Sequence, residues 1–216
     1  MVFIAWLNLF CTSMVILILA TVGNPSELVA EKPIWKVGDT WTYQRLVKGK
    51  FTNYYTQTVV ETQSQFKSKS GYKVEYKSFN REGKVNEKSR SFWYFSVDDL
   101  CYLGREYLDG TTEEPKSMPI KVRWPIKDRK GWRVDHYEPG LSQQVDQVYS
   151  ASIERIKVEA GDFSTFRIHR EFQFSGGEKL PNYIEIWYAP EVKWFIKYFF
   201  YSNDSTEALI KYQINH

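Results

Sequence analysis

This 216-residue chain has few cysteines, few histidines and no charged side chain in its first 22 residues. Its 2 cysteines are Cys11 and Cys101, and only Cys101 lies outside the apolar N-terminal stretch. An intrachain disulfide therefore cannot stabilise the folded part, whose stability must come from packing. Because secreted animal domains more often carry paired cysteines, the lone thiol favours a bacterial envelope protein.

The 3 histidines, His136, His169 and His216, are scattered without a second ligand at metal-binding spacing. The chain also has no Gly-x-Ser-x-Gly motif and no glycine-rich phosphate loop. We therefore expect no metal, no cofactor, no catalytic residue and no enzymatic activity. The acidic pairs Asp98-Asp99 and Glu113-Glu114 leave an unrecognised hydrolase as an alternative, although adjacent acids in loops are usually solvated.

The uncharged N-terminus predicts a signal peptide over residues 1–23, with Thr21-Val22-Gly23 as the cleavage site. An uncleaved N-terminal anchor is the alternative, because the apolar run approaches the roughly 20 residues that span a bilayer. Both predict export to the periplasm or cell envelope of a bacterium, with membrane contact only through this segment if it stays uncleaved. Residues 24–36 read as a linker, and residues 37–216 have the size of a single β domain.

Outside the N-terminus no stretch has the apolar stripe of a helix, whereas alternation with a period of two recurs throughout. The sequence predicts an all-β fold of about ten strands, a curved antiparallel meander that closes toward a barrel or half-barrel. Strands are expected over 40–47, 51–62, 72–79, 85–95, 100–108, 132–137, 145–159, 163–174 and 206–214, with a hairpin over 182–201.

The hairpin is the most apolar part of this pattern. Ile184, Ile186 and Tyr188 alternate with Glu185 and Trp187 on its first arm. The residues that follow Ala189 break the run at a proline, which cannot donate to a strand ladder. The second arm is apolar on both faces, so we expect it to be covered on both sides. In the preceding strand, alternation places five residues together, Phe166, Ile168, Arg170, Phe172 and Phe174.

Aromatic residues make up 17% of the chain, more than a core of this size needs. Core packing accounts for part of them. The surplus of Tyr and Trp would suit a concave face that holds an apolar or sugar-like ligand. We predict that its wall comprises Trp41, Tyr43, Trp93, Trp187 and Tyr188.

A second candidate is a basic segment interleaved with Trp124 and Trp132. It could meet anionic lipid head groups or acidic envelope polymers, although a solvated loop explains the same charges. The net charge of +3 is too small to indicate a nucleic acid partner. The basic residues are Lys121, Arg123, Lys127, Arg129, Lys130 and Arg133.

Four motifs resemble the exported bacterial proteins grouped as DUF3108, which include the TapB-like proteins. They are Val37-Gly-Asp-Thr-Trp-Thr-Tyr43, Trp124-Pro-Ile-Lys-Asp-Arg-Lys-Gly-Trp132, Val158-Glu-Ala-Gly-Asp-Phe-Ser-Thr-Phe-Arg-Ile168 and Trp187-Tyr-Ala-Pro-Glu-Val-Lys-Trp-Phe-Ile-Lys197. In that family glycine usually stands at the position of Lys193. The resemblance implies export and an all-β fold, and it implies no catalytic residue.

These observations favour an exported, non-enzymatic β-sheet module that binds a hydrophobic ligand, a lipid or an envelope component in a curved sheet. A membrane-anchored structural or assembly protein, whose sheet edge recruits a protein partner, is the alternative from another class.

Overall fold

The structure is a computed structural model that describes residues 28–115, 119–137, 144–174 and 176–215. The predicted signal peptide or anchor over residues 1–23 lies outside the described residues. Within them the secondary structure is β, apart from three single-turn 3₁₀ helices. These are η1 (Glu87–Ser89), η2 (Pro190–Val192) and η3 (Tyr201–Asn203).

Twelve strands form one antiparallel sheet made of two meanders joined side by side. The first meander runs in chain order through β2 (Thr40–Val47), β3 (Lys50–Phe66), β4 (Lys69–Phe79), β5 (Ser91–Ser96), β6 (Tyr102–Tyr107) and β7 (Thr112–Glu113). The second is formed by β9 (Gly131–Tyr137), β10 (Gln144–Val158), β11 (Gly161–Phe174), β12 (Lys179–Ala189), β13 (Trp194–Phe200) and β14 (Ser205–Gln213). The pairing of β2 with β14 unites them, so the first and last long strands lie side by side at the centre of the sheet.

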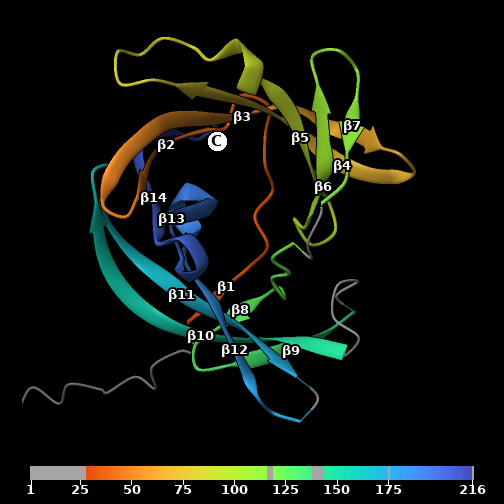
Figure 1. The fold of residues 1–216 in the computed structure, drawn as a ribbon, viewed down its shortest axis with the longest axis vertical. Helices are drawn as coiled ribbons and strands as arrows, with labels where there is room; N and C mark the ends of the chain where they lie inside the picture. The colour runs from red at the N-terminus through yellow and green to blue at the C-terminus, as the bar shows by residue number, and fades with distance from the viewer. Residues whose placement is uncertain (1–27, 116–118, 138–143, 175, 216) are drawn as a thin grey trace, which may run out of the picture.

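The sheet curls into an open half-barrel (Figure 1). In the described ranges no pairing joins the two edge strands, β7 and β9. The connection between them crosses the opening and contains β8 (Ile126–Lys127), which pairs with β1 (Val29–Ala30) in a separate two-stranded sheet. The predicted curved antiparallel meander is confirmed. Strands β1, β7 and β8 have two residues each, too few to show an alternating pattern in the sequence.

The predicted hairpin is confirmed as β12 and β13, joined by η2. Pro190 is the first residue of η2 and lies in the connection, where its missing N–H costs no strand pairing. Lys193 follows in the left-handed conformation at φ 58°. Trp194, Phe195 and Ile196 are all buried at the start of β13, as expected for an arm that is covered on both faces.

The linker predicted over residues 24–36 differs from the structure where that stretch is described. Residues 28–36 run along the inside of the curved sheet (Figure 1), where Trp35 is 2% exposed. The Trp35 ring centroid lies 4.6 Å from that of Trp194 and 5.0 Å from that of Tyr72, and its Nε1 donates to the carbonyl oxygen of Lys193 at 3.0 Å. A single tryptophan among prolines and charges has no periodicity, which is why the pattern did not predict this packing.

Candidate functional site

The concave face of the sheet encloses a cavity of about 1030 Å³. Both meanders contribute to its wall, and residues 119–124 of the connection between β7 and β9 cover part of it. Its volume lies at the upper end of the range typical of small-molecule sites, roughly 300–1,000 Å³. Trp35 packs next to the cavity, because two of its aromatic neighbours, Phe95 and Trp194, also line it.

Six aromatic side chains from five strands form what we call the aromatic wall of this cavity. Trp93 stacks on Tyr76 with ring centroids 4.7 Å apart and an interplanar angle of 3°, and Tyr76 stacks in turn on Tyr55 at 5.3 Å. Burial raises the pKa of the Tyr102 hydroxyl to about 12, so this phenol stays neutral at physiological pH. The wall comprises Tyr55, Tyr76, Trp93, Tyr102, Tyr198 and Phe200.

Of the five residues predicted to line a ligand site, the structure places one, Trp93, on the cavity surface. Three others are fully buried on the concave side of the sheet and do not line the cavity. Trp41 donates its Nε1–H to the carbonyl oxygen of Val192 at 2.8 Å, and the Tyr43 hydroxyl donates to that of Phe195 at 2.6 Å. Tyr188 packs against Trp124 with ring centroids 5.1 Å apart. Each of these three rings packs against a residue that lines the cavity and contributes no surface of its own to it.

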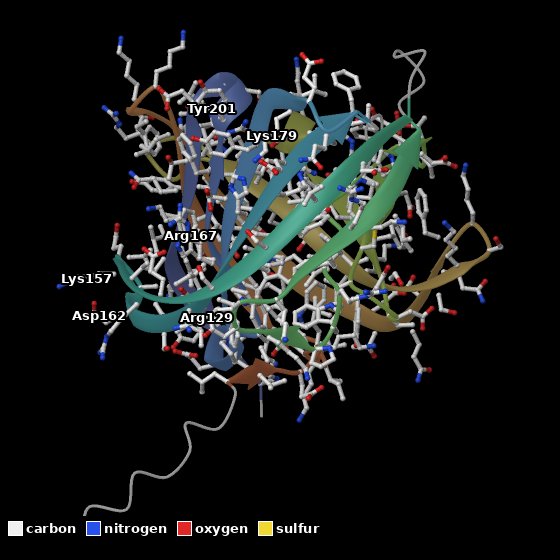
Figure 2. All side chains as sticks on the ribbon, turned by 90° about the horizontal axis from the view of Figure 1, so that it is seen from below. Arg129, Lys157, Asp162, Arg167, Lys179 and Tyr201 are labelled. Atoms are coloured by element: carbon white, nitrogen blue, oxygen red, sulfur yellow. The ribbon has the colours of Figure 1, made fainter. Side chains whose placement is uncertain are left out.

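Trp187 does not line the cavity, because it lies on the convex face of the sheet. Its ring is flanked by the Lys197 ammonium, 4.7 Å from the centroid, and by the Arg167 guanidinium at 5.8 Å. Its Nε1 donates to Glu154 at 3.3 Å. Figure 2 looks onto this outer face and labels Arg167 there. Neighbouring residues of a strand point to opposite faces, so Trp187 and Tyr188 cannot both face the ligand side of β12.

A polar cluster that sequence reasoning missed lies on the wall formed by β2, β3 and β14. Glu207 is 15% exposed, accepts a hydrogen bond from the Tyr55 hydroxyl at 2.5 Å and lies 3.5 Å from Nε of Arg45. Burial raises the pKa of the Glu207 carboxyl above its usual value, and the contacts with Tyr55 and Arg45 oppose that shift without cancelling it. No motif marks this cluster, because Glu207 on β14 is distant in sequence from Arg45 and Tyr55 on β2 and β3.

Glu207→Gln is expected to remove a pH dependence of folding. Because the pKa of Glu207 is higher in the folded protein than in the unfolded chain, its contribution to stability is fully present below the unfolded pKa and is lost as pH rises through the folded pKa. For one proton, the free energy of unfolding cannot change by more than about 1.4 kcal/mol per pH unit. Urea unfolding between pH 4 and pH 8 should therefore show that the variant becomes more stable relative to the wild type as pH rises. A difference in unfolding free energy that stays constant with pH would contradict a raised pKa.

Arg170 on β11 is the second missed residue of the cavity wall, and it is 5% exposed. The signal for it was visible in the strand pattern, where it is the one charged residue on an otherwise apolar face. Burial lowers the pKa of its guanidinium from the usual value. An arginine is almost never buried without a partner, so this position calls for a specific explanation.

The structure does not gather the predicted basic segment into one site. Arg133 points away from the cavity on β9, where it pairs with Asp146 at 3.2 Å and bonds to Gln173 at 2.9 Å. Arg129 is exposed and has Asp128 3.5 Å away. Lys121 lies on the connection, where its backbone N–H donates to the Tyr149 hydroxyl at 3.0 Å. Arg123 and Lys130 are exposed on the same connection, and Lys127 belongs to β8.

The described residues offer little evidence for a metal site, a reactive cysteine or a membrane-spanning helix. No group of three His, Cys, Asp or Glu side chains there could hold a metal ion. Cys101 is buried and unpaired, and burial raises the pKa of its thiol to about 11, so it carries little thiolate at neutral pH. None of the helices within the described ranges has the length and apolarity needed to cross a bilayer.

Comparison with known proteins yields only distant structural neighbours. No family model matches the chain and no curated protein matches it, so the resemblance to DUF3108 stays a prediction. A crystal structure from Bacteroides fragilis NCTC 9343, described as an exported protein with a YmcC-like fold, is 16% identical with a TM-score of 0.46 over 85% of this chain and 99% of that one. A structure from Parabacteroides distasonis ATCC 8503, described as a lipoprotein, is 15% identical with a TM-score of 0.45 over the same shares of the two chains. Nothing about function follows from similarities this low.

Proposed function

We propose that this chain is an exported, non-enzymatic β-sheet module that binds a hydrophobic ligand on the concave face of its half-barrel. The observation that carries this proposal is the cavity of about 1030 Å³ lined by the aromatic wall. A core that served only stability would be filled, because folded proteins leave few voids larger than a water molecule. The flat, stacked rings of Trp93 and Tyr76 offer an apolar surface that a ligand can cover.

Ile184→Trp is expected to abolish binding by filling the cavity. Ile184 lines the cavity from β12, and an indole there would occupy space that the ligand needs. We expect the affinity for a neutral fluorescent probe, N-phenylnaphthylamine, to fall by about tenfold or more, a loss of at least 1.4 kcal/mol. Fluorescence titration measures this, and native mass spectrometry of protein purified from the host envelope without detergent would identify a lipid that the wild type retains and the variant loses.

Tyr183→Trp is the matched control, since Tyr183 is the preceding residue of the same strand and packs on the outer face against Tyr201, with ring centroids 4.6 Å apart. This variant should bind the probe as the wild type does. Equal affinity of all three proteins would overturn the proposal, because it would place the probe outside the cavity. Thermal unfolding of both variants checks that each is folded.

A further inference from the structure

Arg170 is a cation buried in the cavity wall without an anion beside it. In the part of the chain that the structure describes, no carboxylate lies within ion-pair distance of its guanidinium. Its cross-strand partners are Tyr149 on β10 and Ile184 on β12, and its guanidinium lies 4.7 Å from the ring centroid of Phe172. Burial raises the pKa of the Tyr149 hydroxyl, so this neighbour supplies no negative charge at neutral pH.

The other two arginines of the cavity show that this arrangement is specific to Arg170. Arg45 has Glu207, and Arg105 has Glu113 at 2.5 Å. Both carboxylates belong to neighbouring strands and complete the pairs within the protein. A buried charge that lacks such a partner is strongly destabilising unless something else pairs with it.

Two hydrogen-bond donors beside Tyr149 are also unused. Nε of Arg170 is buried and has no acceptor, and the same holds for Nε2 of Gln147, a fully buried residue of β10. The Tyr149 hydroxyl donates to the amide oxygen of Gln147, which leaves the amide nitrogen as the free end of that side chain. Buried donors without acceptors are rare in folded proteins, and a free donor that belongs to an unpaired cation of the cavity wall is what a bound anion would satisfy.

We propose that the cavity binds an amphipathic anion, whose carboxylate or phosphate group pairs with Arg170 while its apolar part lies against the aromatic wall. This inference rests on the proposed function and specifies its ligand class. The cavity lining beside Arg170 includes Phe172 and Ile184, so this part of the wall presents one charged group among apolar side chains. A single head group on a long apolar body matches this distribution, whereas a small inorganic anion would leave most of the cavity unused.

The test compares ligands that share an apolar chain and differ in the head group. Palmitic acid and hexadecyl phosphate are the anionic members, and methyl palmitate and hexadecanol are the neutral ones. Each displaces N-phenylnaphthylamine from the wild type, from Arg170→Gln and from Arg105→Gln at pH 8. We expect the anionic ligands to bind the wild type about 10 to 100 times more tightly than the neutral ones, the factor that one or two charge-assisted hydrogen bonds provide.

Arg170→Gln should reduce this preference to about onefold while it retains binding of the neutral ligands, and Arg105→Gln should keep the full preference. Arg170→Lys should retain part of it, because it keeps the charge and loses the planar fork. Neutral ligands that bind with no preference for the anionic ones would overturn this inference and leave the proposed function intact. If no ligand of either kind binds, both are overturned. Stabilisation by acetate or inorganic phosphate alone, equal to that by the amphipathic anions, would also overturn the inference, since it would identify a site for free anions.

Discussion

Trp35→Ala is expected to lower the free energy of unfolding by about 3–5 kcal/mol, the range for a tryptophan removed from a packed core. The Trp35 ring meets four other aromatic rings, with centroids 4.6 to 5.4 Å away. These rings belong to β2, β4, β5 and β13, so Trp35 joins strands of both meanders on the concave face of the sheet. Urea unfolding, monitored by far-ultraviolet circular dichroism, measures the loss.

Ile34→Ala is the matched control, because Ile34 is the preceding residue and is 71% exposed. The free energy of unfolding of this variant should lie within about 0.5 kcal/mol of the wild-type value, as for most surface substitutions. If Trp35→Ala cost no more than this control, residues 28–36 would be the tether that their composition suggests. A large difference would identify them as part of the folded core, so a shortened chain that begins at Val37 should be unstable.

Local structure was predictable from the sequence because it depends on neighbours in the chain. Strand β2 has the predicted bounds, and the hairpin of β12 and β13 has its connection at Pro190 as expected. The alternating pattern also placed Trp187 and Tyr188 correctly on opposite faces of β12. The prediction of ligand contacts then placed both on one wall, and the structure shows that aromatic content alone does not tell a cavity surface from a buried core or a covered outer face.

Long-range pairing was not predictable in the same way. No turn or pattern indicates that β2 pairs with β14, and that pairing decides which residues share the concave face. Arg45 and Glu207 meet only because of it. Arg170 stood out on an apolar strand face, but the sequence cannot show whether a distant carboxylate reaches it. Only the assembled sheet shows that the other cavity arginines have such partners.

Asp39→Ala is expected to lower the free energy of unfolding by about 3–5 kcal/mol, because it leaves two backbone N–H groups without their acceptor and removes the carboxylate that faces the ammonium of Lys193. The Asp39 carboxylate is 0% exposed and accepts the backbone N–H of Asn215 at 2.7 Å and that of Lys36 at 2.9 Å. The ammonium of Lys193 lies 3.7 Å from it. One side chain thus ties the start of β2 to the end of β14 and to the turn of the central hairpin.

Asp162→Ala is the matched control, since Asp162 is exposed at the turn between β10 and β11 (Figure 2) and should cost less than about 0.5 kcal/mol. Asp39→Asn should lie between the two, because the amide oxygen can still accept one backbone N–H while the charge is lost. Losses as small as the control for both Asp39 variants would contradict a structural role for the carboxylate.

Substitution of Lys193 tests whether its ammonium contributes to the effect of Asp39. Its φ of 58° lies in the region that favours glycine, so Lys193→Gly should relieve strain of roughly 1 kcal/mol while it removes the cation that faces Asp39. If the ammonium is what makes the loss of Asp39 severe, Asp39→Ala should cost less in the Lys193→Gly background than in the wild type. A double-mutant cycle measures that coupling, which we expect to be about 1 kcal/mol for a pair in which the carboxylate is fully buried. If the two substitutions were simply additive, the cost of Asp39→Ala would come entirely from the two backbone hydrogen bonds. The contact with Asp39 would then not offset the strain of Lys193 in its left-handed conformation.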